Sequence, residues 1–229
     1  MSVRRIRPLR DDALSLAFGA LFLVALAGQS IAGFLESNER LQEHGLAPLG
    51  FGAYLTSSDF VVDVAENWQS EFLQFTLFIA ATIWLVQRGS PESKKPGDEG
   101  PGSDEDQLVA DHARPDSPAW ARVRGIRLTI FSNSLLLVMG AVFVLSWFAQ
   151  SLAGTLVMNT ENREHGTPAI TWLEYLGTPD FWNRTLQNWQ SEFLAVGAMI
   201  ALSIFLRQRG SSESKRVGAP HRESSVGSD

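Results

Sequence analysis

The chain has 229 residues, a formal net charge of −6 at pH 7 and 45% hydrophobic residues. Because it contains no cysteine, disulfides, thiolate nucleophiles and cysteine-based zinc sites are excluded. The hydrophobic residues are concentrated in long runs, so the sequence predicts an all-α integral membrane protein rather than a soluble domain.

The first apolar run, residues 13–35, is long enough to cross a membrane. A cleaved signal peptide is the alternative, because residues 25–27 (Ala-Leu-Ala) resemble a processing site. Two aspartates directly before the run argue against cleavage, since signal peptides rarely carry acidic residues there. We therefore predict a transmembrane helix over about 13–35. Within it, Gly28 and Ala32 have the spacing that permits close helix packing.

A Glu-His-Gly tripeptide follows each long apolar run, at residues 43–45 and 164–166. Its histidines, His44 and His165, are weak candidates for a metal site or a proton relay, although their spacing is not that of a helical His-Glu-x-x-His zinc site. The other interpretation is a helix end, with the glycine in the left-handed conformation and the histidine near the negative end of the helix dipole. We favour the helix end, and we expect no metal and no cofactor.

A second helix is predicted in each half from its capping residues. Ser57-Ser58-Asp59 opens one at about 58–88, and Thr178-Pro179 opens the other at about 179–209. The apolar part of the first is about 15 residues or 22 Å long, shorter than a hydrocarbon core of about 30 Å. The polar residues before it are therefore drawn to the outer membrane surface, with Trp68 as an interfacial anchor.

Between the halves lies a stretch rich in Pro, Gly, Ser and acidic residues, and its composition predicts a disordered cytoplasmic linker at 90–117. Ser117 and Pro118 then supply a cap and a proline at the first helical position. A helix is expected to begin there and to continue into a third span at about 128–158. A disordered tail is predicted at 211–229.

The two halves share a heptapeptide: residues 67–73 (NWQSEFL) return 121 positions later as residues 188–194. Self-similarity at one fixed offset indicates a tandem repeat. We predict a first repeat at 1–89 and a second at 118–210. Together they form four transmembrane helices, arranged as a tandem parallel repeat of two helical hairpins.

Lysine and arginine are concentrated before the first span, in the linker and after the last span, whereas the loop inside each repeat carries few. The positive-inside rule therefore places both termini and the linker in the cytoplasm. Both hairpins then have the same orientation, so their pseudo-twofold axis is expected to run along the membrane normal.

Each hairpin is predicted to hold a cluster of polar residues near the outer membrane surface. The candidates are Gln29, Asn67, Gln69, Glu71, Gln150, Asn188, Gln190 and Glu192. Polar groups at that depth need partners, and two interpretations remain open. Glu71 and Gln29 form an interhelical hydrogen bond that locks the hairpin, or Glu71 and Glu192 carry a proton or bind a cation.

These segments resemble a bacterial family of uncharacterised integral membrane proteins. The resemblance rests on Gln-Ser-x-Ala-Gly, Glu-His-Gly, Asn-Trp-Gln-Ser-Glu-Phe-Leu and Gln-Arg-Gly-Ser-x-Glu-Ser-Lys, which occur in both halves. The second half departs from the first at Arg207, where the first has Val86, and at Ser212, where the first has Pro91. The family is described only as a domain of unknown function, so the resemblance implies residence in the bacterial inner membrane and no particular activity.

Two functions follow as expectations. The favoured one is a non-enzymatic structural or interaction scaffold, and the alternative is a small transport, permeation or proton- or ion-sensing module. An enzyme is not expected, because the sequence contains no Ser-His-Asp signature, phosphate-binding glycine loop or metal motif. The expected partners are the lipid bilayer and either a second copy of the chain or another membrane protein. Nucleic acid is not expected, since the basic residues are accounted for as cytoplasmic flanks.

Overall fold

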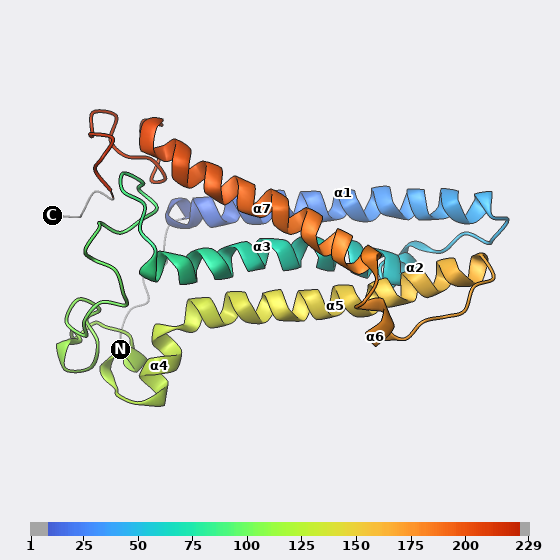
Figure 1. Cartoon of the computed structure of the whole chain (residues 1–229), viewed down its shortest axis with the longest axis horizontal. Coiled ribbons are helices and arrows are strands. Elements are labelled where there is room, and N and C mark those ends of the chain that lie inside the picture. The colour runs from blue at the N-terminus through green and yellow to red at the C-terminus, as the bar shows by residue number, and fades with distance from the viewer. Residues whose placement is uncertain (1–8, 225–229) are drawn as a thin grey trace. The chain divides into compact units, whose positions relative to one another are not determined.

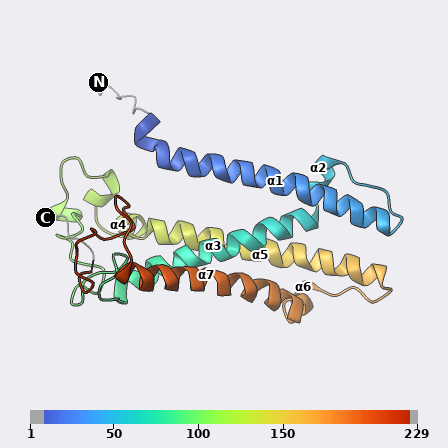
Figure 2. The same ribbon diagram turned by 90° about the horizontal axis from the view of Figure 1, so that it is seen from above.

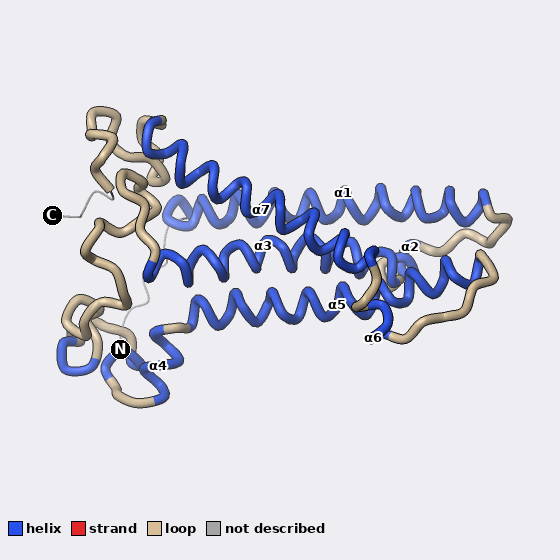
Figure 3. The backbone as a smooth tube through the Cα atoms, viewed as in Figure 1, coloured by secondary structure: helices blue, strands red, loops and turns tan. Residues whose placement is uncertain are grey.

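The computed structural model describes residues 9–224, which form helices, turns and loops without a strand (Figures 1 and 3). The prediction of an all-α protein is confirmed. The α-helices are α1 (Ala13–Glu43), α2 (Phe51–Tyr54), α3 (Ser58–Trp84), α4 (Ile126–Ser132), α5 (Ser134–Glu164), α6 (Trp172–Tyr175) and α7 (Pro179–Phe205). Short 3-10 helices lie at Leu9–Asp12, Ala110–His112 and Ala119–Arg122. The chain divides into two compact units, Met1–Val61 and Val62–Asp229.

The first unit is organised around Tyr54, the last residue of α2. Its ring is almost fully buried and lies 6.0 Å from the ring of Phe34 on α1 and 5.5 Å from that of Phe60. The phenol stands directly over Gly33, where a Cβ atom would lie 3.1 Å from the ring carbon Cζ. Asn38 fastens the loop after α1, because its amide both donates to and accepts from the backbone of Leu49. The close contact in this unit is therefore made at Gly33, whereas no atom lies within 4 Å of a Cβ added at Gly28.

The second unit contains α5, α7 and the part of α3 from Val62 onward, which lie side by side (Figures 1 and 2). Trp189 on α7 donates to Gln69 on α3, and Trp147 on α5 donates to Thr185 on α7. The short helix α6 places Tyr175, which is fully buried, over Gly154 of α5. These contacts join all three long helices of the unit.

The structure repeats several first-unit contacts 121 positions later. Asn159 holds the backbone of Ile170 through the same two hydrogen bonds that Asn38 makes to Leu49. Tyr175 covers Gly154 as Tyr54 covers Gly33. Equivalent residues therefore make equivalent local contacts at both loop attachments.

Several predicted helix boundaries were wrong. The helices α3 and α7 end at Trp84 and Phe205 rather than near 88 and 209. The helices α1 and α5 extend beyond the predicted membrane spans to Glu43 and Glu164, where the Glu-His-Gly segments predict a helix end. The helix expected from Ser117-Pro118 is only a 3-10 turn, since Gly125 adopts a left-handed φ of 77° before α4 begins. The third long helix starts at Ser134, after a break at Asn133.

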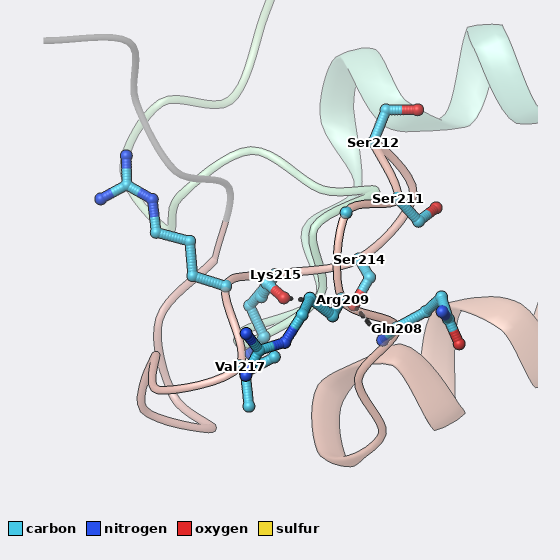
Figure 4. A pocket seen from close by; sticks show the side chains of 9 residues that line it. Gln208, Arg209, Ser211, Ser212, Ser214, Lys215 and Val217 are labelled. Carbon is cyan, nitrogen blue, oxygen red and sulfur yellow. Dashed lines mark hydrogen bonds between the residues drawn. The ribbon is translucent and has the colours of Figure 1, made fainter.

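The early end of α3 and α7 is explained by the loop that follows each helix. The backbone N–H of Gln87 donates to Ser93 Oγ over 2.7 Å, and the backbone N–H of Gln208 donates to Ser214 Oγ over 2.8 Å. Figure 4 shows the second loop, beside a cavity of about 590 Å³. The side chains fold the chain back, so the Gln-Arg-Gly-Ser segment cannot continue the helix.

The region predicted to be a disordered linker, 90–117, forms turns and one 3-10 helix. In the predicted tail, Lys215 is buried and its ammonium donates to the carbonyls of Gly89, Pro220, His221 and Glu223. The disorder of both segments stays a prediction, while residues 225–229 of the tail lie outside the described range.

Two of the described helices, α1 and α5, are long and apolar enough to cross a membrane. The expectation of four such helices is not met, because the first halves of α3 and α7 are too polar. The charged residues of these halves are Asp59, Asp63, Glu66 and Glu71 in α3 and Asp180, Arg184 and Glu192 in α7. Only 6% of the apolar stretch of α1 and 17% of that of α5 is buried. Neither helix is thus covered as the core helix of a soluble protein would be.

Candidate functional site

The carboxylate of Glu66 on α3 lies at the centre of a side-chain network between α3 and α7. Its Oε1 accepts from Asn188 Nδ2 over 2.8 Å and from Gln187 Nε2 over 3.3 Å. Its Oε2 accepts from Arg184 Nη1 over 3.4 Å. The side chain of Glu66 is 11% exposed and that of Arg184 is 31% exposed. A largely buried carboxylate is therefore neutralised by a cation and two amides of the opposite helix.

The network continues from Arg184 to the start of α7. Arg184 Nε lies 3.3 Å from both carboxylate oxygens of Asp180, and Tyr175 Oη donates to Asp180 over 3.0 Å. Burial, followed by the nearby charge of Asp180, raises the pKa of the Tyr175 phenol. The phenol therefore keeps its proton at neutral pH and remains a donor. Four side chains from Tyr175 to Glu66 form one connected chain.

A second polar centre lies at Gln69, three residues beyond Glu66 on the same helix. Gln69 is fully buried, and its Oε1 accepts from Trp189 Nε1 over 2.7 Å. Its Nε2 has no hydrogen-bond partner among the described residues. Gln150 on α5 is also fully buried, and neither polar atom of its amide is paired within the described range. Unpaired buried amides carry a desolvation penalty, so these two glutamines call for an explanation.

Some of the predicted site residues take part in the contacts between α3 and α7, and others are exposed. Asn188 and Gln69 take part in the contacts between α3 and α7. Asn67, Glu71 and Gln190 are exposed, and Asn67 bonds to its own helix at the Asp63 carbonyl.

The two remaining candidates are only partly buried. Glu192 is half-buried and close enough to Glu71 for the charge of that residue to act on it. Gln29 is half-buried and lies in the first unit. Its predicted pairing with Glu71 stays a prediction.

Both weak histidine candidates lie at helix ends. His44 and His165 are the C-caps of α1 and α5, and the glycines that follow them have φ values of 70° and 69°. The interpretation of Glu-His-Gly as a helix end is thus confirmed. Within residues 9–224, no three metal-binding side chains are grouped in a way that could hold an ion.

Five residues of the network were missed from sequence as site residues: Glu66, Tyr175, Asp180, Arg184 and Gln187. A signal was present in the alignment of the two halves. At the 121-residue offset Asp63 corresponds to Arg184, and Glu66 corresponds to Gln187. Both substitutions alter charge just before the identical heptapeptides, which is the pattern expected where two related helices face each other with complementary charge.

A family described as a domain of unknown function, DUF6766, matches residues 5–226. The chain belongs to this family. The resemblance to an uncharacterised family is thereby confirmed, and a single family match covers both halves of the sequence. No curated protein and no solved structure matches the chain.

Proposed function

We propose that this chain is a non-enzymatic scaffold of the bacterial inner membrane, built from two like-oriented helical hairpins with both termini in the cytoplasm. The exposure of the apolar helices α1 and α5 supports membrane insertion, since lipid would cover surfaces that water does not favour. The polar halves of α3 and α7 then project toward the outer surface, where partners would be met.

The carboxylate of Glu66 carries the scaffold proposal. A site for moving protons or ions needs a group that changes its charge or its ligands during the cycle. Glu66 instead has a fixed set of donors, Arg184, Gln187 and Asn188, and all of them come from α7. Such an arrangement joins two helices in one register and thus serves to hold a structure.

Thermal unfolding of the full chain in detergent tests this role. Glu66→Gln is expected to lower stability by about 2 kcal/mol, because the pairing with Arg184 is lost and an amide replaces a charge-assisted acceptor. Glu71→Gln and Glu192→Gln are the controls on the same two helices, and each is expected to change stability by less than about 0.5 kcal/mol. If the controls destabilise the protein as much as Glu66→Gln does, Glu66 has no special structural role and the scaffold argument is lost.

Transport or sensing is the second candidate function, and the unpaired amides favour it. Gln69 and Gln150 are buried polar groups of the kind that a passing ion or a bound water would satisfy. Glu71 and Glu192 are close enough for their charges to interact. Vesicles containing the protein and a pH-sensitive dye distinguish the two functions. The scaffold predicts no proton or potassium flux above that of empty vesicles, whereas transport predicts a flux that Gln150→Leu abolishes.

A further inference from the structure

An aromatic cavity of about 290 Å³ lies within the second unit. Helix α5 contributes one wall, and α6, the residue after it and the start of α7 contribute the other. The lining residues are Val144, Trp147, Phe148, Ser151, Trp172, Leu176, Phe181 and Trp182. We refer to this cavity as the tryptophan pocket.

The aromatic rings of the pocket hold one another in fixed orientations. Trp147 is stacked on Phe181 with ring centroids 6.1 Å apart, and Trp182 meets Phe181 edge to face at 5.3 Å. Phe148 meets Trp172 edge to face at 5.7 Å. Aromatic pairs in these geometries stabilise each other beyond simple burial. The walls are therefore preorganised, which lowers the entropic cost of binding.

All three indole N–H groups are already used within the protein. Trp172 Nε1 donates to Ser151 Oγ over 3.0 Å, Trp182 Nε1 to the Leu176 carbonyl over 3.0 Å, and Trp147 Nε1 to Thr185 Oγ1 over 3.4 Å. Ser151 Oγ in turn donates to the Phe148 carbonyl. The pocket therefore presents carbon atoms to its contents, and an apolar ligand without hydrogen-bonding groups fits it best.

The pocket is continuous with the apolar surface of α5. Val144 and Phe148, which line it, are 57% and 49% exposed, and the neighbouring Leu145 and Leu152 are exposed as well. Under the proposed function this surface faces the hydrocarbon of the bilayer. Hydrocarbon chains are then present at the mouth of the pocket at very high concentration, and no polar group needs to be desolvated when one enters.

We propose that the tryptophan pocket binds one hydrocarbon chain of a membrane lipid. This inference rests on the proposed membrane location of α5. It assigns to the second half a lipid site that the first half does not share, because the walls differ in sequence. At the 121-residue offset Phe148 corresponds to Ala27, Trp172 to Phe51 and Trp182 to Val61. The same backbone positions in the first half therefore lack most of the aromatic surface.

Photolabelling of the full chain in phosphatidylcholine vesicles tests the proposal, with a diazirine placed in one acyl chain of a small fraction of the lipid. Adducts are mapped by mass spectrometry. The first half supplies the internal control, because residues 23–30 and 51–61 correspond to 144–151 and 172–182. The pocket segments are expected to carry several-fold more adducts per residue than the control segments. Equal labelling of both halves would mean ordinary contact with surrounding lipid and would overturn the site.

The variant Phe148→Ala/Trp172→Phe/Trp182→Val gives the pocket the residues of the first half. It is expected to lose the excess labelling at the pocket, while labelling of residues 23–30 is unchanged. If the variant does not fold, the number of adducts per residue in the pocket segments and in the control segments of the wild-type protein still tests the lipid site. Absence of adducts from both α1 and α5 would contradict the membrane location itself. The lipid site would also be overturned if the wild-type protein were a dimer without adducts in the pocket and the variant were a monomer. The pocket would then bind a second copy of the chain.

Discussion

The two identical heptapeptides of this chain have different environments. In the first, Gln69 is fully buried and accepts from Trp189, whereas its counterpart Gln190 in the second is exposed. Asn67 and Asn188 both bond to the carbonyl four residues earlier, but only Asn188 also reaches Glu66. Identical sequences thus diverge in role because the residues beside them and the surfaces opposite them differ.

Charge pairing shows the same divergence at an identical residue. Asp59 in the first half pairs with Arg40 on α1, while its counterpart Asp180 pairs with Arg184 one turn further along α7. Neither arginine has an arginine counterpart, since Arg40 corresponds to Glu161 and Arg184 to Asp63. The first pair joins α1 to the start of α3. In the second half the cation lies on α7 itself, where Arg184 also pairs with Glu66 on α3.

The largest expected effect concerns the contact that the halves share. In Gly154→Ala the new Cβ would lie 2.7 Å from Tyr175 Cζ and 2.9 Å from Cε1, which the buried ring cannot relieve by rotation. Overpacking of this kind is expected to cost about 3 kcal/mol, and a similar loss is expected for Gly33→Ala, where the new Cβ would clash with Tyr54 Oη. Thermal unfolding measures both. Gly28→Ala is the control, since no atom lies within 4 Å of the new Cβ, and it is expected to be neutral or stabilising.

Replacing Arg184 is expected to destabilise the protein more than replacing Arg40. Arg184→Gln leaves Glu66 and Asp180 without a cation, so it should destabilise the protein by about 2 kcal/mol. Arg40→Gln removes an ion pair whose arginine side chain is 55% exposed, and its effect should stay below about 1 kcal/mol. Unfolding midpoints at low and high salt check this difference. Similar losses in both variants would contradict the inference that the partly buried pairing of Arg184 with Glu66 contributes more to stability than the exposed pairing of Arg40 with Asp59.

The loops that follow α3 and α7 each carry a lysine, Lys94 and Lys215, and these two lysines have different environments. Lys94 donates to the single carbonyl of Gly100, whereas Lys215 is buried among four carbonyls. Lys215→Met is expected to cost about 1 kcal/mol locally, because several carbonyls lose a donor. Limited proteolysis should then cut 211–224 faster, with little change for Lys94→Met. Rapid cleavage of this segment in the wild-type protein would instead favour the predicted disordered tail.

A further comparison of the two halves involves a capping box found at α6. Thr171 Oγ1 accepts from the Glu174 amide, and the Glu174 carboxylate accepts from the Thr171 amide. Thr171→Ala is expected to cost about 1 kcal/mol. At α2 the corresponding residues are Gly50 and Ala53, so Gly50→Thr/Ala53→Glu should stabilise the first half by transplanting the box.

The same box predicts a pH dependence with a definite sign. Hydrogen bonds from Thr171 lower the pKa of Glu174 below the usual range of a glutamic acid. The contribution of the Glu174 carboxylate to the free energy of unfolding is therefore complete above its unfolded-state pKa, and it is lost as the pH falls through its folded-state pKa. Unfolding midpoints should separate the wild type from Glu174→Gln at pH 7, and the separation should shrink as the pH falls through the folded-state pKa. A difference that does not shrink at acid pH would rule out the carboxylate as its source.

The helices and their caps were largely predictable, because they depend on residues close in sequence. Thr178 caps α7 before Pro179, and both Glu-His-Gly segments end their helices as expected. The ends near Trp84 and Phe205 were not, since they depend on a serine side chain six residues beyond the amide that it caps. Gly33 and Gly154 were also missed as contact points, because a tyrosine about 20 residues away creates the contact.

The sequence by itself determined the all-α class, the duplicated segments and their shared helix ends, since hydrophobic periodicity and capping act over a few residues. Only the tertiary structure decided which polar residues form the network. Glu66, Arg184 and Gln187 meet because α3 and α7 pack against each other, while Glu71 and Gln190, equally polar, remain exposed. The physical reason is that a charge is held in a partly buried position only where a partner from another helix compensates its lost hydration.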